Sequence, residues 1–228
     1  MKIFVRLTIL VTFVLVYNSA NAYKFDFTTV GDVVDEVKNK FGSLDSYQAQ
    51  FEIVSTKTGK RNVQNGIIKY KNPGKLLVEY QSPYGQKIVS DGKSMWVYIP
   101  SMNVVAEQDL MSDSGIFSSA SRSGLERLFS KYHYRFASKD QPEKMDDGRK
   151  EYTLVLKQRE RKGGFRTIKL WISENYFIRR AKGETSAGKS VEITFSKIQT
   201  DINLPGGLFK FEMPPRARII KNPMIAEE

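Results

Sequence analysis

Few residues in this chain could support acid–base, nucleophilic or metal chemistry. It has no cysteine and a single histidine, His133, which excludes thiol catalysis, thiolate metal sites and sites built from several histidines. His133 lies in the strand-like run 132–135, where it is better interpreted as a half-buried packing residue than as a general base. Asp146 and Asp147 lie in a polar turn, where exposure to solvent gives a carboxyl pKa little reason to shift.

The sequence also lacks the phosphate-loop, dinucleotide-binding, serine-hydrolase and zinc-protease motifs. Two carboxylates that are distant in sequence can still meet in a fold, so an exported hydrolase stays open as the enzymatic alternative. The better-supported expectation is a protein that is not an enzyme and needs no metal or cofactor.

The formal net charge of +11 raises the question of a nucleic-acid partner, but no nucleic-acid-binding motif accompanies it. We therefore expect none. The densest basic clusters outside the N-terminus are Arg159, Arg161 and Lys162, and Arg216, Arg218 and Lys221. They suit anionic lipid or an acidic partner, and plain solvated turns explain them equally well.

The N-terminus has the features of an export signal. Lys2 and Arg6 precede an 11-residue apolar run, and 20–22 form an Ala-Asn-Ala cleavage site. The run is too short for a membrane-spanning helix, which needs roughly 20 residues. We predict a signal peptide over 1–22, cleaved after Ala22, and a protein exported to a bacterial periplasm, since the chain has no cysteine for disulfides.

The elements after the signal begin with a helix. Apolar residues recur at helical spacing over 30–41, Thr29 and Asp32 resemble a capping box, and Gly42 is a plausible C-cap. The period then changes to two, and about ten or eleven strands follow, mostly joined by short turns. One of them is expected over 208–212. The Asp91-Gly92 pair predicts a tight hairpin with positive φ at both central residues. The sequence predicts one domain over 23–228, built on a large antiparallel sheet.

One segment interrupts the strands. Its first part, 111–123, is rich in Ser and Gly and predicts a loop, whereas 124–131 has apolar residues at helical spacing. The two helices could cover one face of the curved sheet and leave a cavity for an apolar ligand. They could equally complete an ordinary packed core.

Four blocks of residues resemble the family of periplasmic outer-membrane lipoprotein carriers, LolA. They are Ser46-Tyr47-Gln48-Ala49-Gln50-Phe51, Gly66-Ile67-Ile68, Asn72-Pro73-Gly74-Lys75-Leu76 and Ile88-Val89-Ser90-Asp91-Gly92-Lys93-Ser94-Met95-Trp96-Val97-Tyr98. The order and spacing match over 30–105, and more loosely to 209–215. The resemblance implies a mainly β fold with an α lid, an incomplete antiparallel β-barrel of about eleven strands covered by helices. It also implies a monomer that takes acylated lipoproteins from an inner-membrane ABC transporter to an outer-membrane acceptor.

The resemblance assigns the lipid-binding side chains to the concave face of the sheet and to the helices above it. From the sheet we expect Tyr47, Ala49, Phe51, Leu76, Val78, Tyr80, Trp96 and Tyr98, and from the helices Val33, Val34, Val37, Leu125, Leu128 and Phe129. Many family members carry Arg before the strand-initiating proline, where it contacts the lid. This chain has Asn72 there, which predicts a weaker lid latch.

A lipid- or lipoprotein-sensing periplasmic protein of the same fold is the alternative function. Such a sensor is expected to carry an added C-terminal domain, whereas this chain ends soon after the Phe-x-Phe stretch at 209–211. That difference favours the carrier.

Overall fold

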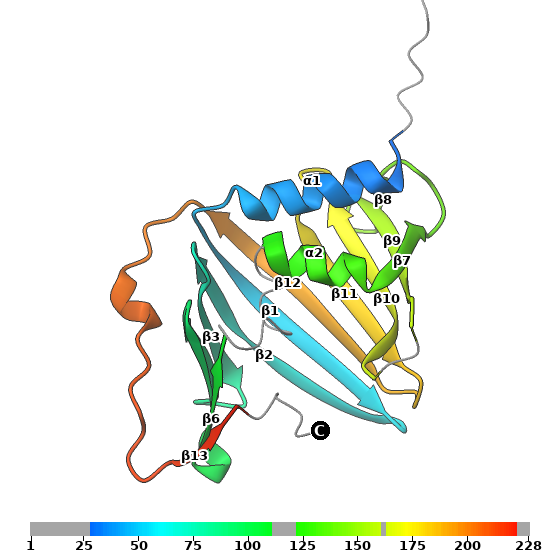
Figure 1. The fold of residues 1–228 in the computed structure, drawn as a ribbon. Helices are drawn as coiled ribbons and strands as arrows, with labels where there is room; N and C mark the ends of the chain where they lie inside the picture. Colours follow the sequence, from blue (N-terminus) through cyan, green and yellow to red (C-terminus); the bar gives the residue numbers. More distant parts are fainter. Residues whose placement is uncertain (1–27, 111–121, 161–162, 223–228) are drawn as a thin grey trace, which may run out of the picture.

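A long, strongly curved antiparallel sheet accounts for most of the protein (Figure 1). The structure is a computed structural model and describes residues 28–110, 122–160 and 163–222. Within them, thirteen strands form one sheet in the order β13-β6-β5-β4-β3-β2-β1-β12-β11-β10-β9-β7, and β8 also pairs with β9. The strands are β1 (Ser46–Lys57), β2 (Lys60–Lys71), β3 (Lys75–Ser82), β4 (Lys87–Asp91), β5 (Ser94–Ile99), β6 (Val104–Asp109), β7 (Tyr132–Phe136), β8 (Glu143–Lys144), β9 (Lys150–Gln158), β10 (Phe165–Ser173), β11 (Ile178–Thr185), β12 (Ser190–Thr200) and β13 (Arg218–Lys221).

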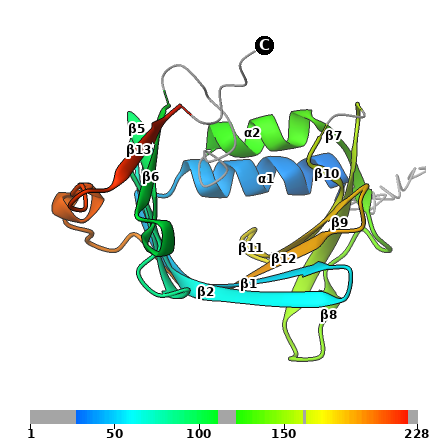
Figure 2. The same ribbon diagram turned by 90° about the horizontal axis from the view of Figure 1, so that it is seen from below.

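The sheet curls without closing, and helices α1 (Val30–Gly42) and α2 (Arg122–Ser130) lie across its open side. Figure 2 shows β3 to β6 as one wall, β2, β1 and β12 as the floor, and β10, β9 and β7 as the other wall. The predicted incomplete barrel with a helical cover is therefore confirmed. Strand pairs are antiparallel except for β13, which is parallel to β6. The prediction of about eleven strands missed β6, β8 and β13 and counted the stretch 208–212, which is not a strand. Strands β8 and β13 have two and four residues, too few to show an alternating pattern.

The start of α1 follows directly from its sequence. Asp32 N–H donates to the Thr29 hydroxyl at 3.1 Å, and Thr29 N–H donates to the Asp32 carboxylate at 2.8 Å, which is the predicted capping box. The Thr29 hydroxyl also donates to the Asp32 carboxylate at 2.7 Å, and this bond, together with that from the Thr29 N–H, lowers the pKa of Asp32 below its ordinary value. The C-cap is Ser43 and not Gly42. A Cβ on Gly42 would lie 3.0 Å from the Arg122 side chain. The absence of a side chain at Gly42 therefore lets the start of α2 pack close to the end of α1.

A hairpin forms at the predicted place, but its central residues are Gly92 and Lys93 and not Asp91 and Gly92, and only Gly92 has a positive φ (+96°). The Asp91 carboxylate accepts hydrogen bonds from the backbone N–H groups of Lys93 and Ser94, both at 2.8 Å. With Gly92 and Lys93 as the two loop residues, Ser90 pairs with Met95. The register of every later residue in β5 follows from this pairing.

That register places Trp96 and Tyr98 on the convex face, so the sequence prediction for these two residues is wrong. Trp96 pairs with Val89, which packs with Leu77 in the outer cluster, whereas Met95 packs with Leu76 on the concave side. Both faces of β5 carry apolar residues, and the sequence pattern therefore gave no sign of which face turned inward.

The stretch 208–212, predicted to be a strand, instead includes the end of a 3-10 helix, η3 (Gly206–Phe209). Pro205 precedes it, and Pro214 and Pro215 follow; proline has no N–H to offer a sheet ladder. The segment runs along the outside of the β3–β6 wall (Figure 2). There Phe211 stacks on Trp96 with ring centroids 5.5 Å apart.

The predicted loop at 111–123 lies mostly outside the described residues. The helix predicted after it is confirmed as α2, which begins two residues earlier than expected. Within the described ranges, we find no helix both long and apolar enough to cross a bilayer.

Candidate functional site

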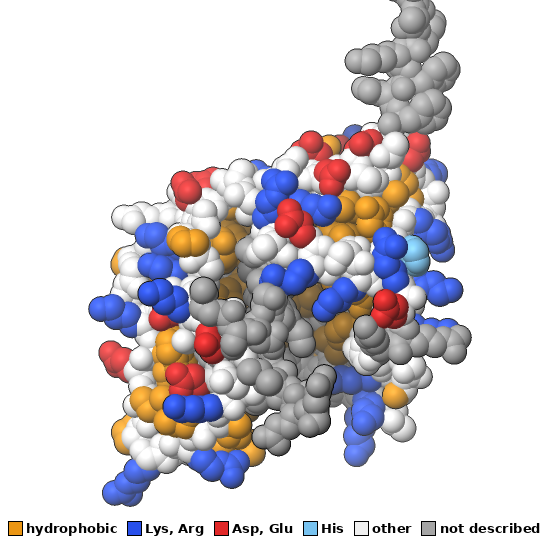
Figure 3. All heavy atoms as spheres, in the orientation of Figure 1, with side chains coloured by type: hydrophobic (Ala, Val, Ile, Leu, Met, Phe, Trp, Pro, Cys, Tyr) orange, Lys and Arg blue, Asp and Glu red, His pale blue; other side chains and the backbone are white. Residues whose placement is uncertain are grey.

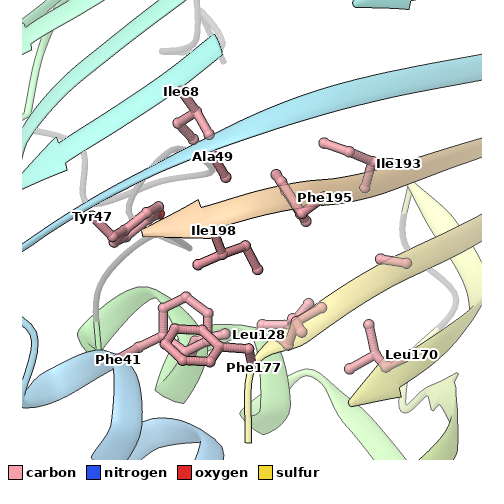
Figure 4. A pocket seen from close by; sticks show the side chains of 13 residues that line it. Phe41, Tyr47, Ala49, Ile68, Leu128, Leu170, Phe177, Ile193, Phe195 and Ile198 are labelled. Carbon is pink, nitrogen blue, oxygen red and sulfur yellow. The ribbon is translucent and has the colours of Figure 1, made fainter. Parts of the chain in front are cut away.

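An apolar cavity of about 250 Å³ lies between the helices and the floor of the sheet. Figure 4 shows its side chains converging from α1, α2 and several strands. None of the residues that line it is charged; they are Phe41, Tyr47, Ala49, Ile68, Leu125, Leu128, Leu170, Phe177, Ile178, Ala181, Ile193, Phe195 and Ile198. An interior of this kind favours hydrocarbon over water.

A second cavity of about 500 Å³ continues beneath α2 towards the β9–β10 hairpin. Four residues line both cavities: Leu128, Leu170, Ala181 and Ile193. The outer part of the second cavity is more polar and includes Arg127, Lys131 and Gln158. The larger cavity falls within the ~300–1,000 Å³ typical of small-molecule sites.

Strand alternation and small residues together explain the hollow. Val191, Ile193 and Phe195 on β12 face inward and remain partly exposed. On β11 the facing positions are Ala181, whose small side chain leaves space beside it, and Gly183, against which the ring of Phe165 packs. A Cβ on Gly183 would lie 2.6 Å from the ring of Phe165. The hollow therefore depends on small side chains on one strand opposite large ones on its neighbours.

Among the residues that line the first cavity, Tyr47 alone has a polar group in its side chain. Its ring stacks on Tyr70 at 5.3 Å between centroids, and Phe41 meets it edge-on at 6.1 Å. Burial, with a smaller contribution from Tyr70, raises the pKa of Tyr47 far above its ordinary value. The phenol stays neutral at any physiological pH, and the first cavity therefore has no charge.

Four residues predicted from the sequence line the first cavity: Tyr47, Ala49, Leu125 and Leu128. The others on the correct face belong to closed clusters beside it. Val33, Val34, Val37 and Phe129 pack with the strands around β9 and β10. Phe51, Leu76, Val78 and Tyr80 pack together on the inner side of the opposite wall.

The two remaining aromatic predictions, Trp96 and Tyr98, hold the C-terminal segment. Trp96 stacks on Phe211, and the Tyr98 hydroxyl lies 3.5 Å from the side-chain oxygen of Asn103. Asn103 in turn donates to the Arg216 carbonyl at 3.1 Å. These residues therefore belong to the outer cover and not to the cavity.

Asn72, the predicted latch position, is exposed at the β2–β3 turn. Its backbone N–H donates to the carbonyl of Asp45 at 2.8 Å. Asp45 lies in the short connection between α1 and β1, so this bond ties the turn to the end of the helix. The latch itself stays a prediction.

The sequence prediction missed most of the floor of the cavity. Ile193 and Phe195 on β12, Phe177 just before β11 and Ile178 at its start all line it. The alternation of apolar and polar residues over 191–196 was visible in the sequence. What it could not show is that β12 pairs with β1, which brings these residues beneath the helices.

Of the two basic clusters, the part that the structure describes is exposed. The guanidinium Nε of Arg159 donates to the Tyr132 carbonyl at 3.2 Å, and Arg218 and Lys221 lie on the exposed edge strand β13. Arg161 and Lys162 lie outside the described residues. A role in docking stays a prediction for both clusters.

Known proteins resemble this chain along most of its length. The family model described as outer membrane lipoprotein carrier protein LolA matches residues 42–212. An outer-membrane lipoprotein carrier protein from Methylibium petroleiphilum is 25% identical over 199 residues, covering 83% of this chain and 89% of the relative. One from Chromobacterium violaceum is 25% identical over 187 residues, covering 82% and 86%.

A solved structure agrees with the fold. The crystal structure of an uncharacterized conserved protein from Thermus thermophilus matches with a TM-score of 0.56 at 14% identity, covering 84% of this chain and 98% of that one. The family match spans well over half of the sequence and includes α2, every strand except β13, and every residue that lines the first cavity except Phe41. The chain belongs to the LolA family of outer membrane lipoprotein carrier proteins.

Proposed function

We propose that this protein is a periplasmic chaperone that binds the acyl chains of lipoproteins in the apolar cavity and carries them from the inner to the outer membrane. The observation that carries the proposal is the uncharged cavity between the two helices and the floor of the sheet. Family membership and the names of the relatives support lipoprotein as the cargo.

The energetics suit transient carriage. Each CH₂ moved from water into an apolar site gains about 0.8 kcal/mol, so one 16-carbon chain could gain roughly 12 kcal/mol. A carrier must also release its cargo, and binding must therefore fall well short of that value. A cavity that is partly lined by α2 can be opened by moving the helix, which weakens binding without altering the sheet.

The partners follow from this role. An inner-membrane ABC transporter would load the carrier, and an outer-membrane acceptor would unload it. The chain would act as a monomer without a cofactor. The predicted signal peptide, 1–22, lies outside the described residues, and N-terminal sequencing of protein recovered from the periplasm would test cleavage after Ala22.

A competition experiment tests the acyl-chain mechanism. Protein purified from the periplasm is loaded with a fluorescent fatty acid and titrated with a synthetic diacylated lipopeptide or with the same peptide lacking acyl chains. We expect the lipopeptide alone to displace the probe. Equal displacement by the unacylated peptide would show that recognition does not depend on the acyl chains.

Transfer distinguishes the carrier from the sensing alternative. Protein loaded with lipopeptide is mixed with outer-membrane vesicles, and the acylated peptide recovered in the vesicles is measured over time. A carrier delivers its cargo. Binding without any delivery, to vesicles that accept lipopeptide from another carrier, would favour the sensor.

Asn72 is proposed to influence release. The hydrogen bond between its backbone and Asp45 places it next to the end of α1, and an arginine there would add donors able to reach the helical cover. Asn72→Arg is expected to alter the rate of probe release. Asn72→Gln, which keeps the amide, is the control. Equal release rates in both variants and the native protein would remove Asn72 from the mechanism.

A further inference from the structure

The cavity beneath α2 has a feature that acyl-chain binding does not use. Arg127 and Lys131 are four residues apart at the C-terminal end of α2, and both line this cavity. The other lining residues include no carboxylate among those that the structure describes. By contrast, no charged residue lines the neighbouring cavity. The two cavities therefore differ at the rim, although they share part of their apolar wall.

Both cations are available to a ligand. In the described ranges, neither Arg127 nor Lys131 forms an ion pair with a carboxylate, whereas Arg122 on the same helix pairs with Glu126 at 3.0 Å. Figure 3 shows Lys and Arg side chains along the lower edge of α2, above a hollow lined by apolar side chains. A cation near the C-terminal end of a helix also stabilises the helix dipole. That role needs no ligand, and the experiment must separate it from binding.

Ester- and amide-linked acyl chains carry no negative charge, so paired cations at a cavity mouth gain from them only hydrogen bonds to neutral carbonyl oxygens, which are weaker than bonds to an anion. An amphiphile with an anionic headgroup satisfies both parts of the site, since its chain lies in the apolar cavity and its headgroup meets the cations. Arginine in particular presents a planar set of donors that matches carboxylate and phosphate oxygens.

We propose that the cavity beneath α2 binds an anionic lipid, with Arg127 and Lys131 at its rim contacting a carboxylate or phosphate headgroup. This inference rests on the proposed acyl-chain site and specifies a ligand class for its outer half. The rim contacts would add selectivity for charge, because the apolar wall alone cannot distinguish an acid from its ester.

A matched pair of probes tests the charge preference. Dansylamino-undecanoic acid and its methyl ester share the same chain and fluorophore and differ in the charge of the headgroup. We expect the native protein to bind the acid more tightly. Arg127→Gln combined with Lys131→Gln should weaken binding of the acid by about fivefold or more, as expected for partly exposed charge pairs. Binding of the ester should not change.

Two further variants make the result specific. Lys60→Gln with Arg61→Gln removes the same charge at the exposed β1–β2 hairpin and should leave both affinities unchanged. Arg127→Lys with Lys131→Arg keeps both positive charges and should preserve the preference for the acid. If the glutamine variant lost binding because it misfolded, keeping the charge would not be what restores the preference. In the native protein, the preference should also shrink at high salt.

A second arm identifies the headgroup. Lysophosphatidylglycerol that displaces the probe more strongly than the zwitterionic lysophosphatidylcholine would indicate an anionic phospholipid, and displacement by laurate alone would indicate a fatty acid. Equal binding of acid and ester by the native protein, or an equal loss of acid binding in the hairpin control, would overturn the inference. If neither probe binds the native protein, the acyl-chain site itself is wrong.

Discussion

The curved sheet has an apolar region on each face, and the chain covers the two regions differently. On the convex side of β3 and β4, Leu77 and Val89 are covered by Leu204 and Phe209 from the C-terminal segment, and all four are at most 5% exposed. On the concave side of β11 and β12, the apolar side chains beneath the helices stay partly exposed around two cavities. The convex region is therefore a closed, fully packed core.

The concave cavity exists because the helices pack tightly against the sheet at one end only. Val33, Val37 and Phe129 fill the space at the β9–β10 end, where all three are at most 2% exposed. Nearer the middle of the floor, β11 offers the small Ala181 beneath the helices, between the larger Leu170 and Ile193 of the neighbouring strands, and the cavities lie beside it. Both regions are apolar, and the sizes of the opposing side chains decide which one is filled.

The largest difference should appear when one phenylalanine is truncated on each face. Phe209→Ala removes a ring that is 1% exposed, and such a deletion typically costs about 3–5 kcal/mol. Phe195→Ala enlarges an existing cavity and should cost roughly 1 kcal/mol or less, since part of its surface is already exposed. Urea denaturation measures both. Equal losses would mean that the concave face is as tightly packed as the convex one.

Filling the cavity should have the opposite effect on binding. Ala181 lines both cavities, and Ala181→Phe would occupy the space that we assign to an acyl chain. Binding of a fluorescent fatty acid should weaken by about tenfold or more, while the free energy of unfolding changes by roughly 1 kcal/mol or less if the ring fits the void.

Ala106→Phe is the matched control for that substitution. Ala106 is partly exposed on β6 and lines neither cavity, so the same increase in volume should leave probe affinity unchanged. Unchanged affinity in the Ala181 variant would place the binding site elsewhere.

A smaller effect is expected at the start of α1, where the helical cover begins. Thr29→Ala removes the side-chain half of the capping box, which typically costs about 1 kcal/mol. The cap also makes stability depend on pH. Because the folded-state pKa of Asp32 is lowered, its contribution is complete above the unfolded-state value and is lost as the pH falls through the folded value.

Acid titration of unfolding checks this second effect. The native protein should lose more stability than Thr29→Ala as the pH falls below about 4, the region of an ordinary aspartate. Parallel curves for the two proteins would show that the cap does not contribute to acid sensitivity. Probe affinity at neutral pH serves to report whether fraying of α1 reaches the cavity.

Local signals in the sequence predicted local structure well. The spacing of Thr29 and Asp32 correctly predicted the capping box, and Asp91-Gly92 predicted the hairpin, because both depend on contacts within a few residues. The cover of two helices over a curved sheet was also predicted. The order of elements and the apolar stripe of each helix left a packed core equally open, and the resemblance to the lipoprotein carriers is what favoured the cover.

The small errors, the C-cap at Ser43 and the central residues of the β4–β5 hairpin, are local, whereas the errors that affect the site involve contacts between distant segments. Trp96 was placed on the wrong face because both faces of β5 are apolar, and its true partner, Phe211, lies more than a hundred residues away. The same partnership explains why the Phe-x-Phe stretch is a cover and not a strand. The cavity itself depends on which small residues meet which large ones across β10, β11 and β12, and one sequence contains no direct signal for that.

The smallest effect on binding and stability should come from the basic residues at the edge of the convex wall. Arg218 and Lys221 lie exposed on β13, on the wall that the C-terminal segment covers and away from both cavities. Arg218→Glu with Lys221→Glu should therefore leave probe affinity unchanged and alter stability by about 0.5 kcal/mol or less.

Charge complementarity acts mainly on the rate of encounter, so delivery of lipopeptide to anionic vesicles by this variant should slow at low salt and recover at high salt. The neutral variant, Arg218→Gln with Lys221→Gln, should fall between the two, and Arg161→Glu with Lys162→Glu tests the other cluster in the same assay. If delivery rates stay the same at every salt concentration, these charges serve solubility, and the two faces of the sheet differ in packing alone.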